Sequence, residues 1–541
     1  MTSLEHKEAT APVARLPRRT LRGFAEPSPD RRARLEAITR TRAFAIAAFG
    51  ALLVISFWFK VRGLYTAYWI DEGLSVGIGS HPFTEIPHLL RQDGSPPLYY
   101  MLLHVWMSWF GTKEFATQSL SAIIGVLSVP AAFWAGRVMF DKRVAWVAAA
   151  IAAVNPFLTV HSFEARMYAL LTLLGLLTTT AFVLAFVQRR RRWLPVFGFL
   201  LAAMLYTHNW ALFFGAACAA ALAWLVWREP TQRRALLRDG AIGFGVSALL
   251  YLPWLPTLAF RARHTGAPWS VAPSPGDMIF GTGTTIGGRG PSVALALAAG
   301  LAMSGFAASR RLRELRTSQA LLILFAGTVL LAFASSQLTP AWASRYLTVS
   351  LAPLILFAAA TLPNAGKVGM WALAIFLAIN LIPQPIHLDR PSFERDVMEV
   401  TGPYTSPGDL VIVTHPERVP LIRHYLGPNY RYADLFGPVR DPQVMNWVDA
   451  LKRVKRVRVQ TNLEPLLATV PVHGRVMLVR PFVDTQAKSW DAPWTKRIWL
   501  QSSRWAKALR TDKRFRLVIA DPRADPGITY GVRAEVYERL R

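Results

Sequence analysis

Apolar runs long enough to cross a bilayer recur along the first two thirds of the chain. A membrane-spanning helix requires roughly 17 to 25 predominantly apolar residues, and in this chain such runs are separated by polar loops. The pattern predicts a mainly α-helical, polytopic membrane protein with about eleven transmembrane helices. The predicted spans lie at 43–61, 117–140, 144–160, 167–187, 193–207, 210–227, 240–258, 291–308, 319–335, 346–362 and 368–384.

Every second loop between these runs is basic, and this alternation predicts the orientation of the spans. Short loops rich in Lys and Arg stay on the cytoplasmic side of a membrane. With all of them inside, the N-terminus is predicted to be cytoplasmic and the C-terminus to lie outside. The basic loops are 141–143, 189–192, 228–238, 310–316 and Lys367.

Two segments near the N-terminus do not follow the simple pattern. Residues 1–42 are rich in Arg and Pro and have no apolar core, so we expect a cytoplasmic, largely disordered tail. The apolar segment 96–110 is short for a span, and if it crossed, every later basic loop would change sides. We therefore expect it to be a juxtamembrane or re-entrant helix within a first outer loop at 62–116.

The chain changes character after about residue 385. Short β-rich runs at 409–413, 475–479 and 515–519 alternate with helix-like stretches, which is typical of a small α/β domain. This domain, predicted at 385–541, follows the eleventh span and should be extracytoplasmic. The transmembrane domain is accordingly predicted at 43–384.

Composition agrees with a membrane protein and excludes other classes. Hydrophobic residues make up 52% and charged residues 17% of the chain, which excludes a disordered protein and argues against a soluble enzyme. The net charge of +28 comes from arginines that lie mostly between apolar runs, so it indicates membrane orientation and not nucleic-acid binding. The single cysteine, Cys218, excludes an internal disulfide and a cysteine-based metal site.

Carboxylates in the first outer loop are the first candidates for chemistry. Asp71 and Glu72 follow an aromatic segment of the kind that favours the membrane interface, and Asp93 supplies a third carboxylate. A partly desolvated carboxylate can act as a general base near neutral pH. The alternative is that all three are solvated loop charges.

Further candidates open the spans that enter from the outer side. Arg166 suits a phosphate because its guanidinium is planar and bidentate, although an ion pair with Glu164 or Asp71 could simply pin helices. A histidine in a turn, such as His208, more often forms hydrogen bonds at a helix end than it binds a ligand. The alternative for Arg345 is that its side chain reaches up to the lipid headgroups. These candidates, which would line an outward-facing site for an anionic, membrane-bound substrate, are His161, Glu164, Arg166, Tyr168, His208, Asn209, Arg345 and Tyr346.

Four short motifs resemble those of the polytopic GT-C glycosyltransferases. They are Trp69-Ile-Asp71-Glu72, Asp93-Gly-Ser-Pro-Pro-Leu-Tyr-Tyr100, Glu164-Ala-Arg166-Met-Tyr168 and Arg345-Tyr346-Leu347. Over about residues 43–400 the chain is similar to the bacterial relatives of protein O-mannosyltransferases and of the lipid A aminoarabinose transferase. One departure is Gly94-Ser95, where the aminoarabinose enzymes carry Glu-Lys.

The resemblance implies a function. It implies inverting transfer of a sugar from a polyprenyl-phosphate carrier to an envelope glycan, lipid or protein on the outer face of the membrane. Asp71 would be the catalytic base, Glu72 would support it or bind acceptor, and Arg166 or Arg345 would hold the lipid phosphate. Asp71 and Asp93 are candidates to bridge a divalent cation, Mg²⁺ or Mn²⁺. The rival hypotheses are a transporter or lipid flippase, and a non-catalytic glycan-binding membrane protein.

Overall fold

The computed structural model describes residues 29–382, 393–483, 488–521 and 530–541. The chain divides into two compact units, 1–51 and 52–541. Helix α1 (Pro29–Val61) begins well before the predicted span at 43–61, so residues 29–42 are helical where disorder was expected. The rest of the expected tail, 1–28, and the predicted domain boundary at 384/385 lie outside the described residues.

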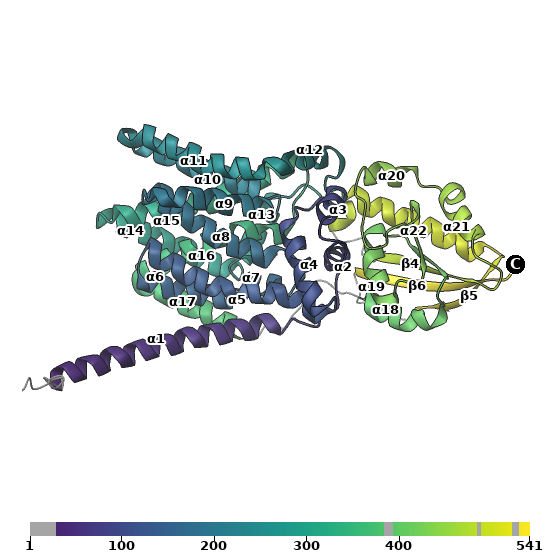
Figure 1. The fold of residues 1–541 in the computed structure, drawn as a ribbon, viewed down its shortest axis with the longest axis horizontal. Helices are drawn as coiled ribbons and strands as arrows, with labels where there is room; N and C mark the ends of the chain where they lie inside the picture. Colours follow the sequence, from purple (N-terminus) through teal and green to yellow (C-terminus); the bar gives the residue numbers. More distant parts are fainter. Residues whose placement is uncertain (1–28, 383–392, 484–487, 522–529) are drawn as a thin grey trace, which may run out of the picture. The chain divides into compact units, whose positions relative to one another are not determined.

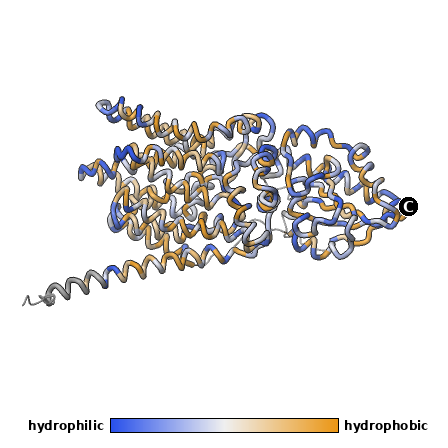
Figure 2. The backbone as a smooth tube through the Cα atoms, in the orientation of Figure 1, coloured by the Kyte–Doolittle hydropathy of each residue, from blue (hydrophilic) through white to orange (hydrophobic). Residues whose placement is uncertain are grey.

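Each of the eleven predicted spans corresponds to helix in the structure. Eight helices in the described part of the chain are long and apolar enough to cross a membrane, and a pair bent by 52°, α6 and α7, makes a ninth. The remaining two predicted spans are α9, of 12 residues, and α17, of 16 residues. The prediction of a multi-pass, mainly helical protein is therefore confirmed, and the orange tubes of Figure 2 show the apolar helices side by side.

The helices that follow α1 are mostly joined by short loops (Figure 1). In chain order they are α2 (Ile70–Gly79), α3 (Ile86–Asp93), α4 (Leu98–Phe110), α5 (Glu114–Met139), α6 (Lys142–Val154), α7 (Pro156–Ser162), α8 (Tyr168–Phe182), α9 (Leu194–Leu205), α10 (Ala211–Arg228), α11 (Arg233–Tyr251), α12 (Leu255–His264), α13 (Pro275–Thr284), α14 (Arg289–Ala308), α15 (Leu312–Leu338), α16 (Thr348–Thr361) and α17 (Gly366–Leu381). A π-helical turn, Val183–Val187, extends α8.

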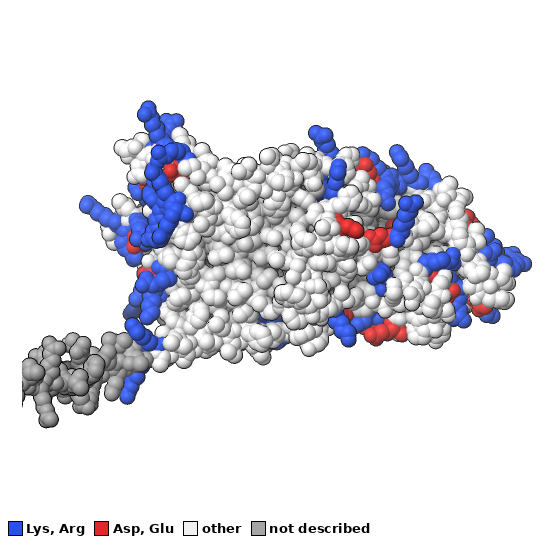
Figure 3. All heavy atoms as spheres, viewed as in Figure 1, with Lys and Arg blue, Asp and Glu red and all other residues white. Residues whose placement is uncertain are grey.

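Polar contacts bring the predicted basic loops together at one end of the helical bundle, which we call the basic end. The Gln188 side chain donates to the carbonyl of Met139, and so does the Arg313 guanidinium. Arg316 pairs with Glu229 at 2.8 Å. In Figure 3, Lys and Arg side chains gather over this end, and the neighbouring surface of the bundle is almost free of charge. This separation of charged and apolar surface is what a bilayer requires.

The segment between α1 and α5 returns to the end of the bundle from which it started. Close to the end of α1, Thr66 accepts a hydrogen bond through its carbonyl from Gln118, near the start of α5. The Tyr68 hydroxyl likewise lies 2.5 Å from the Thr117 hydroxyl. Helix α4, which contains most of the short apolar segment 96–110, therefore does not carry the chain across the bundle, as predicted.

The break between α6 and α7 shapes the loop that follows α7. Asn155 caps α7 by accepting a hydrogen bond from the Leu158 amide at 2.8 Å, an arrangement typical of a helix start. The buried Lys60 ammonium donates to the Ala153 carbonyl at 3.3 Å, at the last turn of α6. These side chains satisfy backbone groups that the bend leaves without helical partners, and they fix the direction of α7.

The C-terminal region is a mixed six-stranded sheet covered by helices on both faces. Its strand order is β3-β2-β1-β4-β6-β5, with β1 parallel to β2 and β4, and with the other pairs antiparallel. The elements are α18 (Glu394–Thr401), β1 (Leu410–Val413), α19 (Val419–Leu426), β2 (Arg431–Asp434), β3 (Gly437–Pro438), α20 (Ala450–Arg456), α21 (Glu464–Ala468), β4 (Arg475–Val483), α22 (Pro493–Thr511), β5 (Phe515–Ala520) and β6 (Tyr530–Arg539).

Two hydrophobic cores lie on opposite faces of this sheet. Leu410 and Ile412 of β1 pack in the core that includes α20, α21 and α22. Val411 and Val413 pack in the core that includes α18 and α19. Successive side chains of a strand point to opposite faces, so a central strand covered on both sides is apolar throughout. Strand β1, Leu410–Val413, which lies within the predicted β-rich run at 409–413, has this composition.

Candidate functional site

A cavity of about 540 Å³ lies at the end of the bundle opposite the basic end. Seven of the predicted site residues line it: Asp71, Asp93, Arg166, His208, Asn209, Arg345 and Tyr346. Four others, Glu72, His161, Glu164 and Tyr168, do not line it. The walls also include Trp69 of the first motif and residues that the sequence did not indicate, among them Arg261, Trp269, Glu417 and Trp447.

Asp71 lies in the first turn of α2, between two guanidinium groups. Its Oδ2 atom is 3.3 Å from Nη2 of Arg345 and 3.7 Å from Nη2 of Arg166. A carboxylate at a helix N-terminus is stabilised by the helix dipole and by unpaired amides. The two arginines come from separate segments, the loop before α8 and the short turn Ser344–Leu347. They hold the carboxylate in one orientation within the cavity.

Arg166 is held firmly through its second terminal nitrogen, Nη1, which does not face the Asp71 carboxylate. Its Nη1 donates to the Asp71 carbonyl at 3.2 Å, to the Ser75 hydroxyl at 3.0 Å and to the Tyr100 hydroxyl at 3.1 Å. These three acceptors fix the guanidinium of a nearly buried residue. These bonds join three segments beneath the cavity: helix α2, helix α4 and the loop that precedes α8.

Arg345 is surrounded by aromatic rings. Its Cζ lies 5.0 Å from the ring centre of Trp69, 5.7 Å from that of Trp269 and 5.4 Å from that of Tyr346. Each ring attracts the cation through its electron-rich face. Since the same guanidinium pairs with Asp71, the aromatic rings and the carboxylate together define its position.

Arg261, on α12, is the third arginine of the cavity. Only 4% of its surface is exposed, and its Nε and Nη1 atoms have no hydrogen-bond partner among the described residues. A buried donor without a partner costs about 1–3 kcal/mol, so such a group is expected where a ligand supplies the acceptor. No pattern in the sequence marks this residue, because its environment depends on contacts with distant segments.

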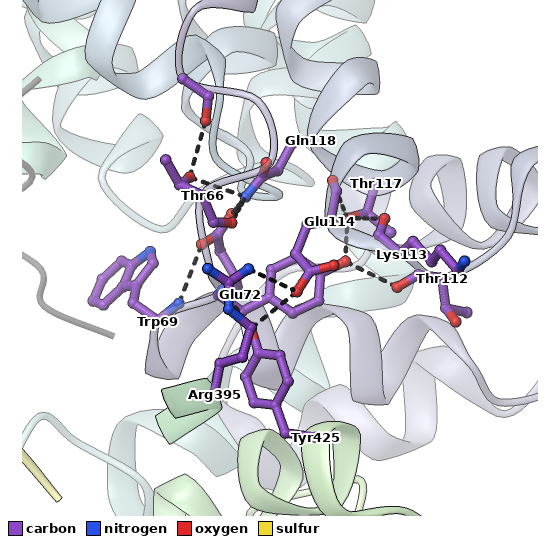
Figure 4. A network of polar contacts seen from close by, with 12 residues as sticks. Thr66, Trp69, Glu72, Thr112, Lys113, Glu114, Thr117, Gln118, Arg395 and Tyr425 are labelled. Atoms are coloured by element: carbon purple, nitrogen blue, oxygen red, sulfur yellow. Dashed lines mark hydrogen bonds and ion pairs between the residues drawn. The ribbon is translucent and has the colours of Figure 1, made fainter. Parts of the chain in front are cut away.

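Glu72 points away from the cavity into a buried polar network (Figure 4). It accepts hydrogen bonds from the Gln118 side chain at 3.1 Å and the Trp69 amide at 3.2 Å, and a third from the Ala165 amide at 2.8 Å. Burial raises the pKa of Glu72 to about 8, although the bond from Ala165 opposes this rise. Glu72 therefore fastens the loop that carries Arg166 to α2 and α5.

The other predicted residues outside the cavity also brace this loop. His161 Nδ1 and Glu164 Oε1 are 3.0 Å apart, and both side chains are buried. The ring of Tyr168 lies between His161, at 5.0 Å, and His208, at 6.2 Å. The structure thus places His161, Glu164 and Tyr168 behind the cavity wall.

His208 and Asn209 join two turns at the cavity wall. Burial lowers the pKa of His208 to about 3, and nearby arginines contribute to this fall, so the ring is neutral at neutral pH. Its Nδ1 accepts a hydrogen bond from the Trp210 amide at 3.1 Å. Asn209 donates to the Gly94 carbonyl at 3.2 Å, which holds the turn beside Asp93.

The predicted metal candidates share the cavity with three arginines. Burial raises the pKa of Asp93, which favours its neutral form, and Asp71 is already paired with cations. Among the described residues, no group of three or more His, Cys, Asp and Glu side chains could hold a metal ion. Hard divalent cations need several oxygen ligands, so these residues do not fit a metal site and suit an anion better.

Comparison with known proteins identifies the class of fold. Residues 94–257 match the family described as dolichyl-phosphate-mannose-protein mannosyltransferase. ArnT from Cupriavidus metallidurans in the apo state has a similar structure, with a TM-score of 0.55 and 14% sequence identity over 81% of this chain and 93% of ArnT. For ArnT bound to undecaprenyl phosphate, the TM-score is 0.54 and the sequence identity is 12%, over 91% of this chain and 97% of ArnT. None of the curated proteins matches the sequence.

The chain therefore has the GT-C glycosyltransferase fold, and the predicted resemblance is confirmed. The likeness to ArnT extends through the C-terminal sheet region, because it covers nearly all of both chains. The predicted fold class, a polytopic helical membrane protein with a small C-terminal α/β region, is confirmed with it.

Proposed function

We propose that this protein is an inverting glycosyltransferase that uses a sugar linked to polyprenyl phosphate. The observation that carries the proposal is a cavity in which one carboxylate, Asp71, is oriented by Arg166 and Arg345, while a third arginine, Arg261, has two donor atoms without partners among the described residues. The GT-C fold and the undecaprenyl phosphate bound by ArnT support a lipid-linked donor.

Each group has a role in a single displacement. Asp71 takes the proton from an acceptor hydroxyl, whose oxygen attacks the anomeric carbon on the face opposite the phosphate. The bond between that carbon and the phosphate oxygen breaks, and polyprenyl phosphate leaves with the bonding electron pair. Arg261 stabilises the charge that develops on the phosphate. Arg166 and Arg345, which were predicted to bind this phosphate, instead orient the base.

The setting of the reaction is part of the proposal. The cavity lies opposite the basic end, which short-loop charge places in the cytoplasm. The reaction would then occur on the outer face of the bacterial inner membrane, where the C-terminal domain also lies. The acceptor would be an envelope glycan, lipid or protein.

The Asp71→Asn variant tests the assignment of the base. Transfer should fall by about 10²–10⁴-fold, the usual contribution of a general base, while undecaprenyl phosphate still binds. The measurement is release of undecaprenyl phosphate from synthetic sugar donors by purified protein, with membranes of a deletion strain as the acceptor source. Asp491→Asn, at an exposed position of the C-terminal domain, is the matched control. A near wild-type rate in Asp71→Asn would exclude Asp71 as the base.

A further inference from the structure

Two residues of the C-terminal domain line the same cavity as Asp71. Glu417 belongs to the short turn Pro416–Arg418 that precedes α19, and Trp447 lies between β3 and α20. The walls facing them carry the arginines of the transmembrane part. The cavity is therefore completed by a domain whose sequence is far from the GT-C motifs.

The segment around Trp447 is bonded to two of the helices that present charged groups to the cavity, α3 and α12. The Trp447 amide donates to the Gln92 carbonyl at 3.0 Å, next to Asp93 at the end of α3. The Asp449 amide donates to the carbonyl of His264, the last residue of α12, at 2.8 Å. These bonds hold the backbone around Trp447, and the ring itself packs against Trp494 at the edge of the sheet-region core.

A second set of contacts fixes the segment that follows Glu417. The Tyr425 hydroxyl accepts a hydrogen bond from the Tyr68 amide at 2.8 Å. It also donates a hydrogen bond to Glu114 at 3.2 Å (Figure 4). Helix α19 also packs closely on α2, because a Cβ atom added at Gly73 would lie 3.0 Å from the side chain of Leu421. The turn that carries Glu417 is thus held against the helix that carries Asp71.

The Glu417 carboxylate is itself oriented by a chain of bonds. Its Oε1 lies 2.5 Å from Nε2 of His415, and Nδ1 of His415 accepts a hydrogen bond from Nε of Arg418 at 2.9 Å. Because Nδ1 accepts, Nε2 carries the proton that faces Glu417. Arg418 is anchored in turn by the buried Glu394. Supporting bonds of this kind are what a precise binding group requires.

We propose that Glu417 and Trp447 form a subsite for the hydroxyl groups of a sugar ring, a proposal that rests on the proposed function. A carboxylate repels the lipid phosphate, so the phosphate must lie toward Arg261 and the hydroxylated group toward Glu417. A carboxylate accepts hydrogen bonds from neighbouring hydroxyls, and an indole offers an apolar face to a ring. The ring could belong to the donor or to the acceptor.

Glu417→Gln tests the subsite. The amide keeps the shape but loses the charge, so binding of the hydroxylated partner should weaken about tenfold or more, as for a hydrogen bond to a charged group. Affinity is measured for undecaprenyl phosphate and for undecaprenyl-phosphate-glucose and -mannose, and turnover is measured with deletion-strain membranes. Glu399→Gln, an exposed position on α18 of the same domain, is the matched control.

The outcomes separate the two sources of the ring. Weaker binding of either sugar lipid, with undecaprenyl phosphate unchanged, places the donor sugar at Glu417. Unchanged binding of all three lipids with slower turnover places the acceptor there. The proposal would be overturned if Glu417→Gln showed wild-type binding and turnover. It would also be overturned if the variant bound undecaprenyl phosphate and the sugar lipids more weakly by the same factor.

A second variant and the wild-type protein complete the test. Trp447→Phe keeps an aromatic ring to pack against Trp494, whose ring centre is 5.1 Å away. It should slow turnover without changing the affinity for undecaprenyl phosphate, and wild-type turnover in this variant would also overturn the proposal. Failure of the wild-type protein to bind undecaprenyl phosphate at all would instead refute the proposed function.

Discussion

Arg261→Met should stabilise the ligand-free protein and remove its response to polyprenyl phosphate. The guanidinium is 4% exposed, and its Nε and Nη1 atoms have no partners within the described residues. Methionine has a similar length and no donors to satisfy, so it fills the same space with apolar atoms. Replacement of a buried cation whose donor atoms lack hydrogen-bond partners is one of the few large-to-apolar changes expected to raise stability. Binding sites often retain such destabilising groups.

The magnitude follows from the two donor atoms. A hydrogen bond to a charged group contributes about 1.5–3 kcal/mol, so two bonds to a phosphate amount to about 3–6 kcal/mol. At about 1.4 kcal/mol per factor of ten, the Kd for undecaprenyl phosphate should rise by about 10²–10⁴-fold. Lipid at 100 times the wild-type Kd stabilises the wild type by about 2.7 kcal/mol. The same concentration should stabilise the variant by about 0.4 kcal/mol or less.

The assay is thermal unfolding of purified protein in detergent, with and without undecaprenyl phosphate. Arg263→Met is the matched control, since Arg263 is exposed on the same helix. We expect Arg261→Met to unfold at a higher temperature than the wild type without lipid, and to show almost no lipid-dependent shift. The control should keep the wild-type shift. A full shift in Arg261→Met would refute the assignment of Arg261 to the phosphate.

Three further predictions concern the network, the domain contact and the topology. Glu72→Gln turns an amide nitrogen toward a backbone N–H donor, so the free energy of unfolding, measured with denaturant, should fall by about 1–3 kcal/mol. The rate of sugar transfer should fall less in this variant than in Asp71→Asn. The hydrogen bond between His81 and Asp441, at 2.9 Å, raises the pKa of His81, and it lowers that of Asp441 against the effect of burial. This contact is therefore complete at pH values below the usual pKa of His81 and is lost as pH rises through the raised pKa. Protection from hydrogen exchange around Asp441, measured relative to the intrinsic exchange rate at each pH, should be lower at pH 8 than at pH 6, and His81→Gln should remove this difference in protection. A reporter that is active only after export should work when fused after Arg541, and activity of a cytoplasmic reporter there would contradict the predicted orientation.

The spans and the grouping of several site residues could be predicted because each rests on a local rule. A bilayer fixes the length of an apolar run, and short basic loops mark one side. Asp71, Arg166 and Arg345 each lie at the end of a segment on the other side, so their proximity follows from the topology. The structure brings all three to one cavity.

The remaining features depend on contacts that no local pattern records. Asp71 and Glu72 are adjacent, but neighbouring residues of a helix point about 100° apart, so the position of α2 decides that one lines the cavity and the other is buried behind it. Arg261 is one arginine among many, and only the tertiary structure shows that its donors lack partners within the described ranges. Glu417 and Trp447 reach the cavity through the packing of the C-terminal sheet region on the helical bundle, within one compact unit.

The position of β6 determines when this cavity can be complete. Strand β6 follows the other five strands in the chain, yet it lies inside the sheet, paired with β4 from Arg475 to Val483 and with β5 on its other edge. A growing chain lengthens by about 5–20 residues per second, and its N-terminal part is made first. The transmembrane helices therefore enter the membrane while the sheet still lacks its interior strand β6. The cavity wall formed by Glu417 and Trp447 is therefore assembled last. If the protein has the proposed function, a nascent or prematurely terminated chain would occupy the membrane without consuming lipid-linked sugar.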